Sequence, residues 1–254
     1  MIPISDDNTR TIQPVIVSIL IGLFCAVFAF EFWLDSKALL DTAIVNFGLI
    51  PANITGPDHT LFTYMFLHAG WGHIIPNLLF LWIFGDNVED AMGHAKFLSF
   101  FIISGMIAGL AHVLLSGPES TLPLIGASAA ISAVLGAYFI LFPDVRIRLL
   151  FPTIVLAPPL LLFGAPLLWR FYVPSTLFIG LWFSIDLFQA IFGGEGGDIA
   201  FWTHIIGFAC GVITAITIKQ SEWKKINYLN LLKDKLRSKR KDHKKLIKRD
   251  FSNR

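Results

Sequence analysis

A serine and a histidine, each set in an apolar stretch of the sequence, are the side chains best suited to chemistry. Ser128 follows Gly126 in "GASAAISAVLG", and His204 lies in "FWTHIIGFACGV". A neutral imidazole can take the proton of a serine hydroxyl and so make the oxygen nucleophilic. Gly126 permits a sharp turn, and a helix that begins near Ser128 leaves unpaired backbone N–H groups around the serine oxygen. Such N–H groups are components of an oxyanion hole.

A second polar pair, His73 and Asn77 in "HIIPN", is spaced so that both side chains project from one face of a helix. Each polar residue also has a structural interpretation. His73 and Asn77 could cap a helix start, and His204 could make an interhelical hydrogen bond. Ser128 could bond back to its own helix.

The composition places these residues in a membrane protein. The 254-residue chain is 55% hydrophobic and 15% charged, and its mean hydropathy is +0.67. Soluble domains carry roughly a quarter charged residues, so this chain lacks the polar groups to cover a water-exposed globular surface. Cys25 and Cys210 lie in separate apolar runs without clustered histidines. That pattern predicts neither a disulfide framework nor a metal site, and no cofactor is implied.

Apolar runs long enough to cross a bilayer, which takes about 20 residues, recur along the chain. We predict six spans, the fourth of them short, over residues 13–34, 73–92, 95–116, 128–142, 174–192 and 200–218. Residues 150–169 are apolar but are broken by Pro152, Pro158, Pro159 and Pro166. Because proline disrupts helices, we interpret this segment as a loop that skims or re-enters the membrane before span five. The expected fold is an all-α bundle of six transmembrane helices.

A basic tail follows the last span. From Lys219 onward the chain has 14 Lys and Arg against 4 Asp and Glu, whereas the preceding 218 residues have 6 against 14. A basic block beside a membrane is favoured at anionic cytoplasmic lipid, by about 1 kcal/mol per Lys or Arg. Nucleic acid is the alternative partner for such a run, and the juxtamembrane position favours lipid over nucleic acid. We therefore expect a membrane domain over residues 1–218 and a basic cytoplasmic tail over residues 219–254.

The tail also sets the orientation through the positive-inside bias. An even number of spans puts both termini on the cytoplasmic side of a multi-pass protein of the cell membrane, inner or plasma. Spans two, four and six then enter from outside, so the polar residues of all three share one level near the outer face. We place Asp186 deeper, in mid-span, and therefore predict a Ser–His dyad without a carboxylate beside His204.

Small residues on two of the spans predict that the helices approach closely. Gly207 and Gly211 on span six form a G-x-x-x-G pattern, and Ala133 and Gly136 lie on span four. Small side chains let membrane helices come into near backbone contact. A hydrogen bond between a serine and a histidine on two helices requires such an approach.

The order and spacing of three motifs resemble the rhomboid intramembrane serine proteases. The motifs are "HAGWGHIIPNLLFLWIFGDNVE" at 68–89, "GAS" at 126–128 and "HIIGFACG" at 204–211. They fall on the second, fourth and sixth predicted spans, and the resemblance covers roughly residues 61–211. It implies cleavage of peptide bonds in or beside the transmembrane segment of a membrane-protein substrate, with no metal or cofactor.

The resemblance also implies roles for individual residues. Ser128 corresponds to the family's nucleophile and His204 to its general base. His73 and Asn77 correspond to the residues that stabilise the oxyanion together with backbone N–H groups near Ser128.

Two positions depart from the family pattern. Ala129 stands where the G-x-S-G motif has a glycine, and alanine keeps the backbone N–H that the oxyanion needs. Ser132 stands where some members carry an aromatic ring stacked on the catalytic imidazole. Two other functions remain open: a catalytically silent relative that binds membrane-protein clients, and a small-solute transporter. The lack of internal repeats argues against the transporter.

Overall fold

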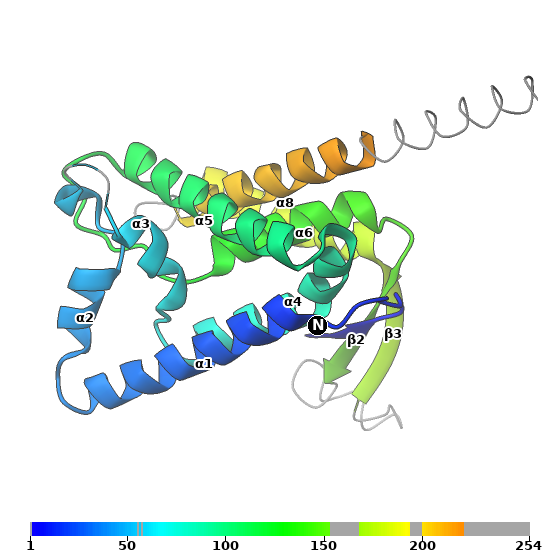
Figure 1. The fold of residues 1–254 in the computed structure, drawn as a ribbon, viewed down its shortest axis with the longest axis horizontal. Coiled ribbons are helices and arrows are strands. Elements are labelled where there is room, and N and C mark those ends of the chain that lie inside the picture. The colour runs from blue at the N-terminus through cyan, green and yellow to red at the C-terminus, as the bar shows by residue number, and fades with distance from the viewer. Residues whose placement is uncertain (1, 55, 57, 153–167, 194–199, 221–254) are drawn as a thin grey trace, which may run out of the picture. The chain divides into compact units, whose positions relative to one another are not determined.

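A computed structural model describes residues 2–54, 56, 58–152, 168–193 and 200–220 of the chain, and most of these residues are helical (Figure 1). The long helices are α1 (Val15–Asp35), α4 (Trp71–Met92), α5 (His94–Ser116), α8 (Ser175–Phe192) and the helix Ala200–Gln220. A shorter helix, α6 (Ser128–Leu141), lies among them. Each of these helices begins and ends within two residues of a span predicted from the sequence.

Among the described residues, four helices are long and apolar enough to cross a membrane: α1, α5, α8 and Ala200–Gln220. The pair Thr60–Phe66 and Trp71–Met92 meets the same criterion when taken together, across a bend of 94°. The apolar helix α6 has 14 residues and is shorter than a typical span.

Short elements connect α1 to α4. They are α2 (Leu40–Phe47), the 3-10 turn η1 (Pro51–Asn53), α3 (Thr60–Thr63) and the 3-10 turn η2 (Tyr64–Phe66). Leu49 forms an isolated antiparallel bridge with Leu124, just before α6. The bridge ties this connection to the chain that leads into α6.

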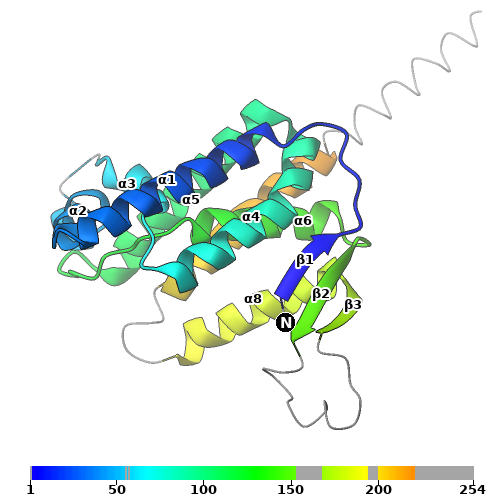
Figure 2. The same ribbon diagram turned by 90° about the horizontal axis from the view of Figure 1, so that it is seen from below.

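A three-stranded antiparallel sheet stands at one end of the helices (Figure 2). Its strands are β1 (Ile2–Asp6), β2 (Arg146–Pro152) and β3 (Leu168–Pro174), in the order β1-β2-β3. The described residues are mostly helical, which is consistent with the expected all-α membrane fold, and the small sheet is an addition that the sequence did not predict. Residues 150–152 and 168–169, which the sequence placed in a loop, lie in strands β2 and β3. The rest of that predicted loop, 153–167, lies outside the described residues. Strands β2 and β3 pair with each other, and β1, from far away in the sequence, pairs along the other edge of β2.

Helix α6 is the buried centre of the bundle. Every residue from Ala129 to Tyr138 is buried. A Cβ atom built on Gly207 or Gly211 would collide with the carbonyl of Ala129 or Ala133, respectively. On the other side of the same contact, a Cβ on Gly136 would collide with the Phe208 carbonyl. The helix Ala200–Gln220 and α6 are thus in direct backbone contact, as their small residues lead one to expect.

The chain separates into two compact units, residues 1–215 and 216–254. The fold and the site belong to the first unit. The predicted basic tail falls almost entirely on residues 221–254, outside the described part of the chain.

Candidate active site

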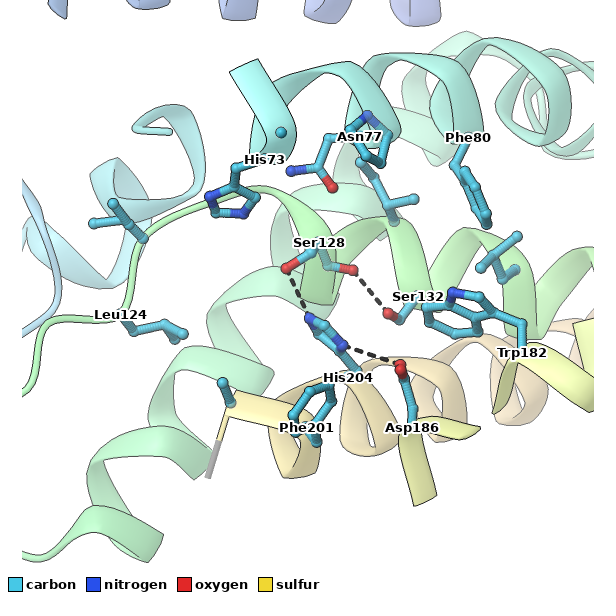
Figure 3. A pocket seen from close by; sticks show the side chains of 16 residues that line it. His73, Asn77, Phe80, Leu124, Ser128, Ser132, Trp182, Asp186, Phe201 and His204 are labelled. Atoms are coloured by element: carbon cyan, nitrogen blue, oxygen red, sulfur yellow. Dashed lines mark hydrogen bonds and ion pairs between the residues drawn. The ribbon is translucent and has the colours of Figure 1, made fainter. Parts of the chain in front are cut away.

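Ser128 and His204 lie within hydrogen-bond distance of each other. The Ser128 Oγ is 2.8 Å from the His204 Nε2, and the two side chains come from α6 and from the helix Ala200–Gln220 (Figure 3). Both residues are partly exposed. The glycine contacts at Gly207 and Gly211 explain the short distance, because a larger residue there would push the two helices apart.

The turn before Ser128 depends on Gly126. Its φ of +108° lies in a region that favours glycine, and its N–H donates to the Tyr64 carbonyl at 2.9 Å. Helix α6 begins at Ser128 without a side-chain cap on its first turn. The first N–H groups of a helix have no partner within the helix. The backbone N–H groups of Ser128 and Ala129 are therefore available beside the serine oxygen.

His73 and Asn77 lie one turn apart near the start of α4 and line the same cavity as Ser128 (Figure 3). The Ala69 N–H donates to the His73 Nδ1 at 3.3 Å, so a neutral His73 carries its own proton on Nε2. That edge of the ring lies against Gly126, where a Cβ would stand 2.5 Å from Nε2. The Asn77 side chain is buried, and within the described part of the chain its Nδ2 has no hydrogen-bond partner. Asn77 thus presents an unused N–H donor at the cavity that His73 also lines.

A carboxylate stands beside His204, so the prediction that none would do so is wrong. The Asp186 Oδ2, from α8, is 3.0 Å from the His204 Nδ1 (Figure 3). The Asp186 side chain is 9% exposed and that of His204 is 19% exposed. Ser128, His204 and Asp186 form one continuous chain of hydrogen bonds from three helices.

Aromatic rings flank the His204 imidazole. The Trp182 ring, from α8, lies with its centroid 6.2 Å from that of the imidazole, at an interplanar angle of 28°. The Phe201 ring meets the imidazole edge-on at 6.0 Å. The Ser132 hydroxyl donates to the Ser128 carbonyl at 2.8 Å. Ser132, at the position where some family members carry an aromatic ring, thus hydrogen-bonds to the backbone of α6.

A cavity of about 360 Å³ joins these groups. Its wall includes Ser128, His204 and Asp186, and its opposite side includes His73 and Asn77. Ile131, Leu135 and other apolar side chains complete the lining. A serine hydroxyl, an imidazole and several N–H donors therefore face one space, an arrangement in which acyl transfer can take place.

The contact between Asp186 and His204, which the sequence analysis did not predict, could have been found by counting residues along the two helices. Asp186 lies six residues before the end of α8, and His204 lies four residues after the start of the next helix. At 1.5 Å per residue these positions are ~9 Å and ~6 Å from the two adjoining helix ends. The difference in depth is smaller than the reach of two side chains. Counting both residues from the connection between their helices indicates that they can meet.

Comparison with known proteins points to one family. The Rhomboid domain model matches residues 58–221. The chain is 33% identical over 87 residues to Rhomboid protein 1, mitochondrial, of Saccharomyces cerevisiae, which covers 33% of this chain and 25% of that protein. It is 37% identical over 57 residues to Rhomboid protease GlpG of Salmonella newport, which covers 22% of this chain and 21% of that protein. The matched part is thus a quarter or less of each relative.

The family match spans more than half of the chain and contains the described helices from α3 to Ala200–Gln220. The chain belongs to the rhomboid family. With its several long apolar helices, it is a multi-pass membrane protein.

Proposed function

We propose that this rhomboid-family chain is an intramembrane serine endopeptidase that cleaves peptide bonds in or beside the transmembrane segments of membrane proteins. The observation that carries the proposal is the 2.8 Å contact between the Ser128 Oγ and the His204 Nε2, in a cavity with free N–H donors. The printed name of the Salmonella relative, a rhomboid protease, supports the same activity.

The first half of the reaction acylates the enzyme. The Ser128 Oγ attacks the carbonyl carbon of the scissile bond while its proton passes to the His204 Nε2. The carbonyl oxygen becomes an oxyanion in a tetrahedral intermediate. Collapse of the intermediate breaks the C–N bond, and the imidazolium gives its proton to the leaving amine. The amino-terminal fragment of the substrate remains bound to Ser128 through an ester of its new terminal carboxyl group.

The second half releases the product. A water molecule gives a proton to the His204 Nε2 and attacks the ester carbon, which forms a second tetrahedral intermediate. When that intermediate collapses, the Ser128 oxygen leaves, recovers its proton from His204, and frees a carboxylic acid. The same imidazole thus acts as base and acid in each half.

The free donors stabilise both tetrahedral intermediates. Asn77 Nδ2 is a buried donor with no protein partner, and a developing oxyanion would satisfy it. The His73 Nε2–H and the backbone N–H of Ser128 or Ala129 complete an oxyanion hole. Donors fixed in advance around such a charge each contribute about 10²–10³ in rate.

The proposal includes an orientation for the six predicted spans. Positive charge concentrated after residue 219 favours a cytoplasmic C-terminus in the cell membrane. The short helix α6 is then the fourth span, and Ser128 lies near the outer face. Anionic lipid at the inner surface is the proposed partner of the basic tail.

The test is cleavage of a single-span membrane substrate by the purified chain in lipid vesicles. We expect the parent to cleave, and Ser128→Ala and His204→Ala to be inactive. Ser99→Ala is the matched control, because its hydroxyl donates to the Ala95 carbonyl on an exposed face of α5. Cleavage by Ser128→Ala at the parent rate would contradict the proposal. Binding of substrate without cleavage by the parent would instead support the silent, client-binding alternative.

A further inference from the structure

We propose that Asp186, with Trp182 one turn before it on α8, positions the imidazole of His204 and fixes which of its nitrogens carries the proton. The site would then work as a Ser–His–Asp relay assembled from three helices rather than as a two-residue dyad. This inference rests on the proposed peptidase activity and goes beyond it by assigning a role to α8.

The burial of Asp186 is the first support. Its carboxyl group lies within an apolar helix and is 9% exposed. An ionisable side chain inside a membrane segment is costly and is kept where a partner compensates it. In the described part of the chain, His204 is the hydrogen-bond partner of Asp186, at 3.0 Å. The carboxylate therefore depends on the same imidazole that meets Ser128.

The two nitrogen contacts of His204 define its tautomer. An ionised carboxylate can only accept a hydrogen bond, so the His204 Nδ1 must donate to Asp186. A neutral imidazole that is protonated on Nδ1 has its lone pair on Nε2. That lone pair faces the Ser128 hydroxyl at 2.8 Å, where it can accept the proton. When Nε2 takes the proton, the nearby carboxylate stabilises the resulting imidazolium.

Trp182 restrains the plane of the same ring. It is four residues before Asp186, so both side chains project from one face of α8. Its ring lies at 28° to the imidazole, close to parallel. On α6, Ser132 stands one turn after Ser128, and its hydroxyl donates to the Ser128 carbonyl. The orienting aromatic thus comes from α8 in this chain.

Helix α8 is itself seated firmly at its start. The Ser175 N–H donates to the Val145 carbonyl at 2.8 Å, and its hydroxyl donates to the Phe142 carbonyl at 2.6 Å. The residues of α8 that are buried recur at helical spacing and form one stripe: Ser175, Ile179, Asp186 and Ala190. Asp186 therefore lies on the buried face of α8, where packing restricts its side chain.

The decisive variant replaces the Asp186 carboxylate with an amide of nearly the same size. In Asp186→Asn, the amide NH2 can donate to Nδ1, which moves the imidazole proton to Nε2 and removes the acceptor for Ser128. We expect kcat to fall by about 10²–10⁴ with little change in KM, since the same exchange in soluble serine proteases costs about 10⁴. Asp186→Glu keeps a carboxylate that can accept from Nδ1, so its kcat should be at least tenfold higher than that of Asp186→Asn. Trp182→Ala should lower kcat less than Asp186→Asn does.

Ser184→Ala is the matched control on the same helix, because the Ser184 hydroxyl is exposed and donates to the Gly180 carbonyl. It should cleave at the parent rate. The thermal unfolding midpoint of each variant in detergent tests for a merely structural effect. We expect Asp186→Asn to be folded and to show a cooperative unfolding transition, although its kcat is reduced.

Nitrogen-15 NMR of histidine-labelled protein reads the tautomer directly. The parent should show His204 protonated on Nδ1, and Asp186→Asn should shift the population towards the Nε2-protonated form. If the parent cleaves its substrate while Asp186→Asn cleaves equally fast with an unchanged tautomer, the positioning role is overturned and the peptidase stands. If the parent does not cleave at all, the proposed function fails first.

Discussion

Helices α4 and α6 each carry polar residues at both of their ends, and the two ends differ in how those residues are satisfied. The site end holds His73 and Asn77 at the start of α4 and Ser128 at the start of α6. The strand end holds Asn87 late in α4 and Tyr138 late in α6, beside strand β1. Both ends are packed by the same apolar helices.

At the strand end the polar groups satisfy one another. The Asp6 Oδ2 accepts hydrogen bonds from the Tyr138 hydroxyl and from the Asn87 Nδ2, the latter at 2.6 Å. The Asn87 Oδ1 accepts from the Asn8 Nδ2 at 2.7 Å. Glu89, which is fully buried, accepts the N–H groups of two residues in the first turn of α1, at 2.9 Å each. Buried polar groups that are paired in this way hold a fold together.

At the site end the donors are left open. Asn77 and Asn87 are both buried, with exposed fractions of 5% and 1%, yet among the described residues the Asn77 Nδ2 has no hydrogen-bond partner. A cavity of about 360 Å³ lies in front of it. An unpaired buried donor costs about 1–3 kcal/mol, a cost that is understandable where a reacting group will occupy the site. Polar residues within a membrane bundle are therefore distinguished by their unused hydrogen bonds rather than by their burial.

Two asparagines on one helix give the sharpest test of this contrast. Asn77 and Asn87 are ten residues apart on α4, a separation of ~15 Å. We expect Asn77→Ala to reduce kcat by about 10²–10³, because it removes a proposed oxyanion donor, and to leave the free energy of unfolding near the parent value. Cleavage kinetics and chemical unfolding in the same detergent measure the two effects.

Asn87→Ala should show the reverse behaviour. It removes the hydrogen bonds that Asn87 makes with Asp6 and Asn8, so the free energy of unfolding should fall by about 1–3 kcal/mol. The kcat of the folded protein should stay at the parent level. The contrast breaks down if Asn87→Ala loses kcat as strongly as Asn77→Ala while it remains folded.

A smaller effect is expected from the titration of Asp6. Burial raises the pKa of Asp6 from its ordinary 3.8 to about 6; the Tyr138 hydrogen bond opposes this increase, and the nearby Asp86 carboxylate adds to it. The folded protein then binds more protons than the unfolded chain between these two values. Stability from this group is therefore greatest at low pH and declines as the pH rises from about 4 to about 6.

Asp6→Asn should remove that part of the pH dependence. The variant keeps an oxygen that can accept from Tyr138, but it does not ionise. We expect its unfolding midpoint, relative to that of the parent, to be higher at pH 7 than at pH 4.5. Parallel midpoint curves for the two proteins across this range would show that Asp6 does not contribute.

The sequence was sufficient to predict what depends on local pattern. The apolar runs predicted the helix ends closely, and Gly126 before Ser128 marked the turn that exposes the helix start. The number of spans between the four polar residues predicted that they lie at a similar depth in the membrane: Ser128, His204, His73 and Asn77. The structure brings these four residues to one cavity.

What was missed depends on partners distant in the chain or on neighbouring helices. Strand β2 pairs with β1 about 140 residues earlier, and an apolar, proline-broken segment contains no sign of that partner. Asp186 meets His204 because two consecutive helices run antiparallel, so a residue that is mid-span by count faces one near the start of the next helix. Both the strand β2 and the contact of Asp186 with His204 thus depend on tertiary pairing, which the local sequence does not encode.

The most direct test of the account is the reaction of a fluorophosphonate probe with the folded protein, followed by peptide mapping. Such a probe traps a serine whose oxygen has been activated as a nucleophile. We predict that the parent is labelled on Ser128 and that His204→Ala, with the same serine but no base, is not. Labelling of a different residue, or equal labelling of Ser128 in His204→Ala, would contradict the assignment of Ser128 as a nucleophile activated by His204.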